Sequence, residues 1–396
     1  MKVLIGFADA LAAIESAWSL LDAGFEVSAF AREGSKPPLR RVGSLELHSI
    51  APPEVDSAAS LADLRSLVER VGADGAMPLD DVSLCLCRDA CADSGVALIG
   101  PRGRQAEIAL DKRLQLEAAA AAGFAVPSTS FLDSPRCQEE LELPLVVRPA
   151  VAVRERAGRL ASSAGAATCA DAAELERALA AFGEDEAPMA QPQLRGTGEG
   201  IFGIATPEGV HAWSAHRRVR MMNPAGSGSS ACESIPLEQP LRECAERLIR
   251  DIGWSGLFMI ELLRDEAGAP WFIELNGRAW GSMALARAGG LEYPAWAAKL
   301  ALGGTRDDLP VAAPLAQRRA RHLGREIVHV LTVIRGPRSA AVPWPSRLRT
   351  IRDVLSWRRG DRAYNWRRRL SELPLLIDDT FSTVAGAIFR KRASAA

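Results

Sequence analysis

A carboxylate and a carboxamide stand two positions apart in the apolar segment WFIELNGRAW, residues 271–280. The segment is short and rich in aromatic and branched residues, which predicts a strand, and side chains in a strand alternate between faces. Glu274 and Asn276 therefore point to the same side. Glu261 lies in a second apolar segment, GLFMIELL at 256–263, and the intervening RDEAGAP predicts a turn. A hairpin centred near residues 267–268 brings Glu261 opposite Glu274, with roughly 5 Å between their Cβ atoms.

Two carboxylates and an amide oxygen on one face are suited to a hard divalent cation. Burying two like charges side by side costs several kcal/mol unless a positive charge neutralises them. Mg²⁺ prefers such oxygen ligands and keeps its other positions for water and substrate phosphates. The pattern therefore predicts a metal site formed by Glu261, Glu274 and Asn276. The alternative is that the two acids pair with arginines on a solvent-exposed sheet face.

Arg278 follows two residues after Asn276 and is expected beside the metal. A fixed cation next to Mg²⁺ stabilises the charge that develops on a transferred phosphoryl group. The segment therefore predicts phosphoryl transfer, with Arg278 as a catalytic residue. No serine or cysteine stands in a nucleophile motif, which agrees with a reaction that needs no side-chain nucleophile.

The elements that must position these residues follow an α/β pattern. Residues 1–100 alternate strand-like and helix-like segments, which implies a parallel sheet with helices on its faces. The first turn, GFADA at 6–10, lacks a G-x-G-x-x-G fingerprint, so we expect a Rossmann-like scaffold without a dinucleotide site. One helix is expected from about 105 to 124, then a strand at 143–149, a helix at 171–182 and a strand at 188–194. Strand-like pieces run to about 235, and a helix near 237–252 precedes the hairpin.

The composition is that of a globular protein of two or three domains, with 396 residues of which 48% are hydrophobic and 24% charged. Residues 311–396 hold 18 Arg and Lys against 6 Asp and Glu, whereas residues 1–310 hold 30 against 43. The seven cysteines lack paired metal-site spacing, which favours free thiols in a reducing cytosol over a metal cluster. A cytoplasmic location is therefore expected. No apolar stretch approaches the roughly 20 residues needed to cross a bilayer.

Three motifs, taken in order along the chain, resemble the ATP-grasp superfamily, in its carbamoyl-phosphate-synthase-like, carboxylate–amine ligase branch. They are HRRVRMMNPAGSGSSACES at 216–234, GWSGLFMIE at 253–261 and ELNGRAWGSMALARAGGLEYP at 274–294. The resemblance extends from residue 1 to about 305 and implies a mixed α/β and α+β fold. Its expected parts are a Rossmann-like pre-ATP-grasp domain (1–104), an ATP-grasp domain (105–310, small lobe about 126–192) and a basic, Trp- and Arg-rich, mainly helical extension (311–396).

The resemblance also implies how a nucleotide is bound. ATP would lie between two lobes, with Mg²⁺, or Mn²⁺ in its place, on the three oxygen ligands named above. Lys112, one of only five lysines among 48 basic residues, would meet the phosphates as a point charge. Arg148 stands where the family usually has a second lysine. Arginine can still hold phosphate bidentately, although its fork is bulkier.

An adenine hinge and an acceptor residue are implied as well. The hinge would comprise Gln191, Pro192, Gln193 and Leu194. Pro192 lacks an amide hydrogen but keeps its carbonyl, which can accept from the adenine amino group while the Leu194 amide donates to the ring. Glu199 would bind the ribose hydroxyls, and Arg218 would point into the acceptor site near the γ-phosphate. The neighbours His216, Arg217 and Arg220 are equally compatible with a solvated basic edge strand.

The implied activity is that of an ATP-dependent ligase. A substrate carboxylate would be activated as an acyl phosphate and joined to an amine or similar nucleophile, with release of ADP and phosphate. The rival is a nucleotide-binding regulatory or scaffold protein without turnover, whose basic tail binds an anionic partner. Small carboxylates and amines are therefore the expected partners, nucleic acid is not, and a homodimer stays open.

Tryptophan and arginine are interleaved in PWPSRLRTIRDVLSWRRGDRAYNWRRRL, residues 343–370. Such a stretch can lie on an anionic membrane surface, contact an anionic polymer, or pack its tryptophans on the acidic body of the chain. The opposite charges of the two parts make docking on the body the preferred interpretation, and a peripheral membrane contact stays open.

Overall fold

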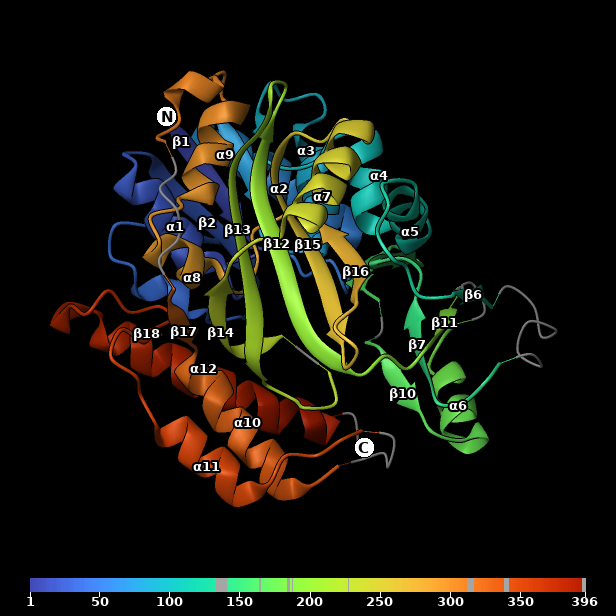
Figure 1. The fold of residues 1–396 in the computed structure, drawn as a ribbon. Coiled ribbons are helices and arrows are strands. Elements are labelled where there is room, and N and C mark those ends of the chain that lie inside the picture. Colours follow the sequence, from blue (N-terminus) through green and yellow to red (C-terminus); the bar gives the residue numbers. More distant parts are fainter. Residues whose placement is uncertain are drawn as a thin grey trace.

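The computed structural model describes residues 1–132, 141–163, 165–183, 186, 188–226, 228–311, 317–337 and 342–393. Three larger sheets organise these residues: one of five strands from the first hundred residues, one of four strands from residues 130–192, and one of seven strands that extends into the C-terminal region. Figure 1 shows the seven-stranded sheet in the centre, the four-stranded sheet to its right and the C-terminal helices below.

The N-terminal sheet is parallel, with the order β3-β2-β1-β4-β5. Its strands are β1 (Lys2–Gly6), β2 (Glu26–Arg32), β3 (Glu46–Ile50), β4 (Gly75–Pro78) and β5 (Ala97–Leu98). The helices are α1 (Ala13–Asp22), α2 (Ser57–Val71) and α3 (Asp81–Cys91), with a 3-10 turn at Pro38–Arg41. Asp80 caps α3 by accepting from the Ser83 amide at 2.7 Å. This cap sets Asp81 in the first turn, just beyond the carboxyl end of β4.

The single helix expected from about 105 to 124 is in fact two helices. They are α4 (Arg104–Leu110) and α5 (Lys112–Ala121), and Asp111 between them is extended and caps α5 through the Arg113 amide at 2.7 Å. The Lys112 amide donates to the Ala150 carbonyl at 2.8 Å, so the junction is attached to the strand region after β7. The break therefore fixes Lys112 at the start of a helix beside the four-stranded sheet.

The four-stranded sheet has the order β10-β7-β11-β6. Its strands are β6 (Ser130–Phe131), β7 (Leu145–Pro149), β10 (Ala167–Cys169) and β11 (Pro188–Pro192), and α6 (Ala172–Leu179) connects the last two along the chain. A separate two-stranded hairpin, β8 (Val153–Arg156) and β9 (Arg159–Ser162), follows β7. Strands β7 and β11 pair antiparallel, so Arg148 near the end of β7 lies opposite Met189, and the segment that follows β11 lies beside the start of β7.

The seven-stranded sheet has the order β16-β15-β12-β13-β14-β17-β18. Five of its strands are β12 (Gly196–Thr206), β13 (Gly209–Met221), β14 (Ser229–Ile235), β15 (Gly256–Asp265) and β16 (Pro270–Asn276). Helices α7 (Gln239–Asp251), α8 (Met283–Ala288) and α9 (Tyr293–Ala301) accompany them. In the β15–β16 hairpin Glu261 pairs with Glu274 and Met259 pairs with Asn276. The register predicted from the turn is confirmed.

The C-terminal region contributes both helices and strands. Its elements are β17 (Arg319–Arg321), α10 (Leu323–Arg335), α11 (Arg347–Leu355), β18 (Arg362–Ala363) and α12 (Leu373–Ala393), with 3-10 turns at Arg306–Asp308 and Leu370–Glu372. Strand β17 pairs antiparallel with β14 and parallel with β18, so this region completes the large sheet and is more than a helical appendage.

Arginines of the same region contact the N-terminal part of the chain. The Arg367 guanidinium lies 4.3 Å from the centroid of the Trp18 ring, and it forms an ion pair with Asp22 at 3.2 Å. An acid of the C-terminal region also contacts the N-terminal part of the chain, because Asp378 of α12 pairs with Arg40 at 2.6 Å. The basic tail thus contacts the body through charged residues, whereas the expected packing of its tryptophans on the body stays a prediction, and Trp357 is 48% exposed. Over the part of the chain that is described, no helix combines the length and apolarity needed to cross a bilayer.

Candidate active site

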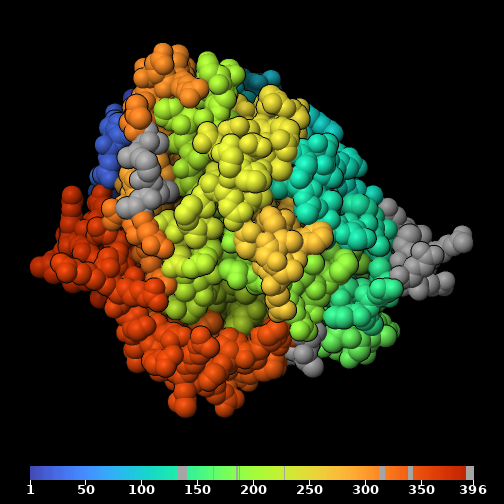
Figure 2. Space-filling model, viewed as in Figure 1, coloured from blue at the N-terminus to red at the C-terminus, as the bar shows by residue number. Residues whose placement is uncertain are grey.

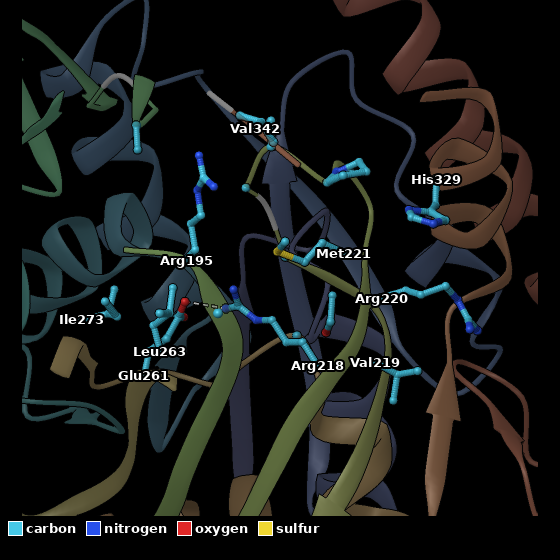
Figure 3. A pocket seen from close by; sticks show the side chains of 18 of the residues that line it. Arg195, Arg218, Val219, Arg220, Met221, Glu261, Leu263, Ile273, His329 and Val342 are labelled. Carbon is cyan, nitrogen blue, oxygen red and sulfur yellow. Dashed lines mark ion pairs between the residues drawn. The ribbon is translucent and has the colours of Figure 1, made fainter. Parts of the chain in front are cut away.

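A cavity of about 1530 Å³ lies where the small sheet, the large sheet and the C-terminal region meet. Its walls include residues of β7 and β11, of β13, β15 and β16, and of the segment 319–358. Figure 2 shows the surface hollowed above the orange C-terminal helices, and Figure 3 looks into the cavity. Glu261, Glu274 and Asn276 all line it, together with Arg148, Arg218 and Arg278.

The three predicted metal ligands converge on one side of the hairpin. Asn276 Nδ2 donates to Glu274 Oε1 at 2.9 Å, and Glu274 stands directly across the strand pair from Glu261. Two carboxylates and the remaining Asn276 oxygen form a donor set of the kind that Mg²⁺ prefers. Among the described residues no group of three or more His, Cys, Asp or Glu could hold a metal ion, so a cation bound here would take further ligands from water or phosphate.

Cations surround both carboxylates. Arg218 Nη2 lies 2.5 Å from Glu261 Oε1, the ion pair dashed in Figure 3. Arg148 Nη2 lies 3.2 Å and Lys112 Nζ 3.9 Å from Glu274 Oε2. The acids do pair with arginines, as the alternative interpretation required. The face is not exposed, however, because the side chains are only 15% and 25% accessible and line the cavity.

The two acids differ in their titration. Burial alone would raise the pKa of Glu274, but Arg148, Lys112, the Asn276 hydrogen bond and Arg278 together lower it to about 2. Burial raises the pKa of Glu261, and the neighbouring charge of Glu274 acts in the same direction against the pull of Arg218. Glu274 is therefore held ionised, while Glu261 depends on Arg218 for its charge. A divalent cation at this position would stabilise both ionised forms.

Gly198 on β12 gives Arg218 its path to Glu261. Arg218 starts on β13, whereas Glu261 is on β15, and β12 lies between them. A Cβ atom on Gly198 would lie 2.7 Å from Arg218 Cδ, closer than side chains approach one another. Gly200, two residues on, pairs with Glu261 itself. Gly198 is thus the sequence signal for an arginine crossing the strand, whereas a Cβ atom on Gly200 would meet Phe202.

Arg278 is held by a residue that the sequence did not suggest. Its Nε lies 2.7 Å from Asp81 Oδ1, and its Nη2 lies 3.2 Å from Asp81 Oδ2. Asp81 belongs to the N-terminal sheet region, so the ion pair connects that region to the end of β16. The only signal in the sequence is the acidic pair Asp80-Asp81 directly after a strand, because a carboxyl end of a parallel strand commonly borders a site.

Lys112 contacts Glu274 from outside the cavity wall. It is 9% exposed and does not line the cavity, and its ammonium faces Glu274. Burial lowers the pKa of Lys112, although Glu274 opposes that shift. Lys112 thus supports the Glu274 carboxylate, and a direct contact with phosphate stays a prediction.

The expected adenine hinge lines the cavity throughout. Gln191, Pro192, Gln193 and Leu194 are all part of its wall. Gln191 Nε2 donates to Thr129 Oγ1 at 2.9 Å, and the Gln193 amide donates to the Pro144 carbonyl at 3.1 Å. Gln191 and Gln193 are thus held by neighbouring segments. A test of the predicted adenine hinge therefore concerns Pro192 and Leu194.

The prediction for Glu199 is wrong in its geometry. Glu199 pairs with Leu262, one residue out of phase with the Gly200–Glu261 pair, so its side chain lies on the opposite face of the sheet. There it is 8% exposed and accepts from Arg264 Nε at 3.0 Å, away from the cavity. Glu199 is a structural ion-pair residue and cannot reach a ribose in the cavity.

The basic residues next to Arg218 form ion pairs or hydrogen bonds with other parts of the chain. Arg217 pairs with Glu233 at 2.7 Å, and Arg220 pairs with Glu326 at 2.6 Å. His216 is buried and shares a hydrogen bond of 2.8 Å with Ser282, and burial lowers its pKa to about 3. The β13–β14 register shifts after Arg218.

The chain is similar to an ATP-grasp family model and to a known ligase. Residues 209–322 match the family model described as ATP-grasp in the biosynthetic pathway with Ter operon. The chain is 28% identical over 225 residues to a D-alanine–D-alanine ligase of Methylococcus capsulatus. That match covers 52% of this chain and 65% of the relative, which is less than two thirds of the relative's length.

Solved structures show the same fold at low sequence identity. An L-amino acid ligase from Bacillus licheniformis superposes with a TM-score of 0.63 at 18% identity, covering 80% of this chain and 78% of that one. The biotin carboxylase domain of the Hydrogenobacter thermophilus 2-oxoglutarate carboxylase, solved with MgADP and bicarbonate, gives 0.60 at 18% identity, covering 77% and 70%. The resemblance predicted from the sequence is confirmed: the chain has the ATP-grasp fold, and its residues 209–322 carry an ATP-grasp family signature.

Proposed function

We propose that the protein is an ATP-dependent ligase that activates a carboxylic acid as an acyl phosphate and joins it to an amine. The observation that carries the proposal is the convergence of Glu261, Glu274 and Asn276 in one cavity, ringed by Arg148, Arg218 and Arg278. The relatives named above as ligases support the general reaction.

The chain's own residues divide the work between binding and charge stabilisation. Glu261, Glu274 and Asn276 would hold Mg²⁺, which when bound neutralises phosphate charge and orients the terminal phosphate. Arg148 reaches the same cavity from the small sheet and would bind phosphate oxygens in place of its present partner Glu274. The hinge at Gln191–Leu194 would accept adenine at the edge of β11.

Arg278 and Arg218 would act on the transferred group. A carboxylate oxygen of the acid attacks the γ-phosphorus, the bond from phosphorus to the bridging oxygen breaks, and ADP leaves. The amine then attacks the acyl carbon, loses a proton, and displaces inorganic phosphate. Asp81 keeps the Arg278 guanidinium in a fixed orientation, so its charge is available without reorganisation as negative charge develops.

The test is turnover of ATP with pooled acids and amines. The protein is incubated with Mg·ATP and pools of carboxylic acids and amines, and phosphate release and product mass are followed. Release of ADP that depends on one acid supports the ligase. Glu274→Gln should abolish that release, whereas Glu238→Gln, an exposed acid outside the cavity, should leave it unchanged.

Binding without turnover would favour the rival function. If Mg·ATP binds but no acid or amine in the pools stimulates phosphate release, the protein is better described as a nucleotide-binding regulator or scaffold. The ion pairs that already neutralise Glu261 and Glu274 are the structural feature compatible with that outcome. Failure to bind nucleotide at all would refute both.

A further inference from the structure

One end of the cavity has more positive charge than a nucleotide site explains. Nine arginines line the cavity and only three carboxylates do, those of Glu261, Glu274 and Asp353; six of the arginines have a carboxylate within ion-pair distance, so the excess is smaller than the count of lining residues. Four of these arginines belong to the C-terminal region, at positions 319, 325, 349 and 358. A concave surface with such an excess of fixed charge concentrates anions. The small sheet and its hinge are at the other end, so this end is available to a different ligand.

Arg325 is an arginine of this end that is partly buried and has no carboxylate partner among the described residues. It lies in the first turn of α10, and its Nη1 donates to the Ser229 carbonyl at 3.2 Å. A Cβ atom on Gly228 would lie 2.5 Å from the same nitrogen, so the guanidinium rests on the backbone at the start of β14. Over the described residues, no carboxylate lies within ion-pair distance of Arg325. By contrast, Arg319 has Glu233 at 2.9 Å.

The acid whose charge acts on Arg325 is engaged elsewhere. Asp379 of α12 accepts from Asn365 Nδ2 at 3.0 Å and lies 3.4 Å from His322. Burial raises the pKa of Asp379 to about 6. Burial and the nearby charge of Arg218 lower the pKa of Arg325 itself. A half-buried guanidinium without a carboxylate partner is costly, and an anionic ligand would remove that cost.

His329 lies one turn further along the same face of α10. Its side chain is 4% exposed and lines the cavity, and its Nδ1 has no hydrogen-bond partner among the described residues. Figure 3 shows His329 and Glu261 on opposite sides of the cavity in that view. Residues four apart on a helix are neighbours. Arg325 and His329 therefore mark one patch of the wall, separate from the proposed metal ligands.

We propose that Arg325, at this patch, binds the second anionic group of an acid substrate. The inference rests on the proposed ligase function and names its substrate class: a carboxylic acid that carries a further carboxylate or phosphate. The reacting carboxylate would lie near Arg278 and Glu261, and the second anionic group would take the place of the missing partner of Arg325. The C-terminal region thus supplies a specificity residue that lies outside the nucleotide motifs.

The test compares matched acids by isothermal titration calorimetry in the presence of Mg·ADP. The probes are α,ω-dicarboxylic acids of four to eight carbons, the monocarboxylic acids of equal length, and ω-phosphono acids as the phosphate arm. Wild-type protein should prefer at least one dianionic series over its monocarboxylic match by about tenfold or more, the scale of one charge-assisted hydrogen bond. Which series is preferred distinguishes a second carboxylate from a phosphate.

Variants assign the preference to one residue. Arg325→Gln should reduce it to less than about twofold, and Arg325→Lys should restore part of it. Arg335→Gln removes an exposed arginine from the other end of α10, outside the cavity, and should keep the full preference. Thermal unfolding of each variant confirms that it is folded.

Two results would overturn the inference. One is the absence of any dianionic preference in the wild type, and the other is a preference that survives in Arg325→Gln. Both are read separately from nucleotide binding, which is titrated first with Mg·ADP alone. If the wild type binds Mg·ADP but shows no preference for dianionic acids, only the proposed substrate class is refuted. If the wild type does not bind Mg·ADP, the proposed function is refuted.

Discussion

The ion pair between Asp81 and Arg278 should couple the N-terminal sheet region to the active site, and a double-mutant cycle can measure that coupling. The side chains meet at 2.7 and 3.2 Å and are 24% and 23% exposed. Breaking a fully buried pair costs about 3–5 kcal/mol, whereas an exposed pair contributes about 0–1 kcal/mol. The partial exposure places the expected coupling energy between these limits, at about 2 kcal/mol.

The assay is urea unfolding of the wild type, Asp81→Asn, Arg278→Gln and the double variant. Asp81→Asn also weakens the favourable charge at the start of α3, but the cycle cancels that effect because it occurs with and without Arg278. The matched control is the pair Arg88–Asp89 on the same helix, which has the same 2.7 Å contact but is 43% and 45% exposed. Its coupling should be below about 1 kcal/mol.

An Asp81–Arg278 coupling energy no larger than that of Arg88–Asp89 would refute this expectation. In that case each side chain would be held in place by its own segment of the chain. The bidentate contact would then contribute nothing to the packing of α3 against the end of β16.

Three further predictions follow from the site. Gly198→Ala places a Cβ atom 2.7 Å from Arg218 Cδ, so turnover should fall about tenfold or more through displacement of Arg218, and an unchanged rate would show that Arg218 has room to move. Glu199→Gln should lower the unfolding free energy by about 1–3 kcal/mol through its partner Arg264 while nucleotide affinity stays constant; a loss of affinity would reinstate its role at the ribose. The pKa of Glu274, about 2 in the folded chain, lies below the unfolded value of about 4.3, so its ionised form stabilises the fold. The difference in stability between wild type and Glu274→Gln should be fully present above pH ~4.3 and should shrink as the pH falls towards about 2, measured by unfolding at each pH.

Local rules predicted the parts of the site that are close in sequence. The Glu261–Glu274 register followed from the position of one turn, and Asn276 followed from the period of the strand. Strand β3 was missed because its sequence, ELHSI, alternates too weakly to indicate burial. The helix break at Asp111 was missed because good helix formers flank it on both sides; the signal in the sequence is Asp111 itself, since aspartate is favoured at the N-cap of a helix.

Contacts between distant segments could not be predicted. Asp81 and Arg278 are 197 positions apart, and no periodicity connects them. The error on Glu199 is one of phase: a shift of one residue along a strand exchanges the two faces of a sheet. The uncompensated charge of Arg325 becomes visible only when α10 is packed beside β14, because its sequence context is that of an ordinary exposed helix.

Strand β17 has a consequence for the way the chain can be divided. It covers the edge of β14 with three residues, and β18 continues the sheet beyond it. A fragment that stops at residue 310 would retain every nucleotide motif but would leave the backbone amides and carbonyls of β14 open to pairing with other molecules. Such a fragment should self-associate through that strand, so attempts to isolate the catalytic part are best made with β17 retained.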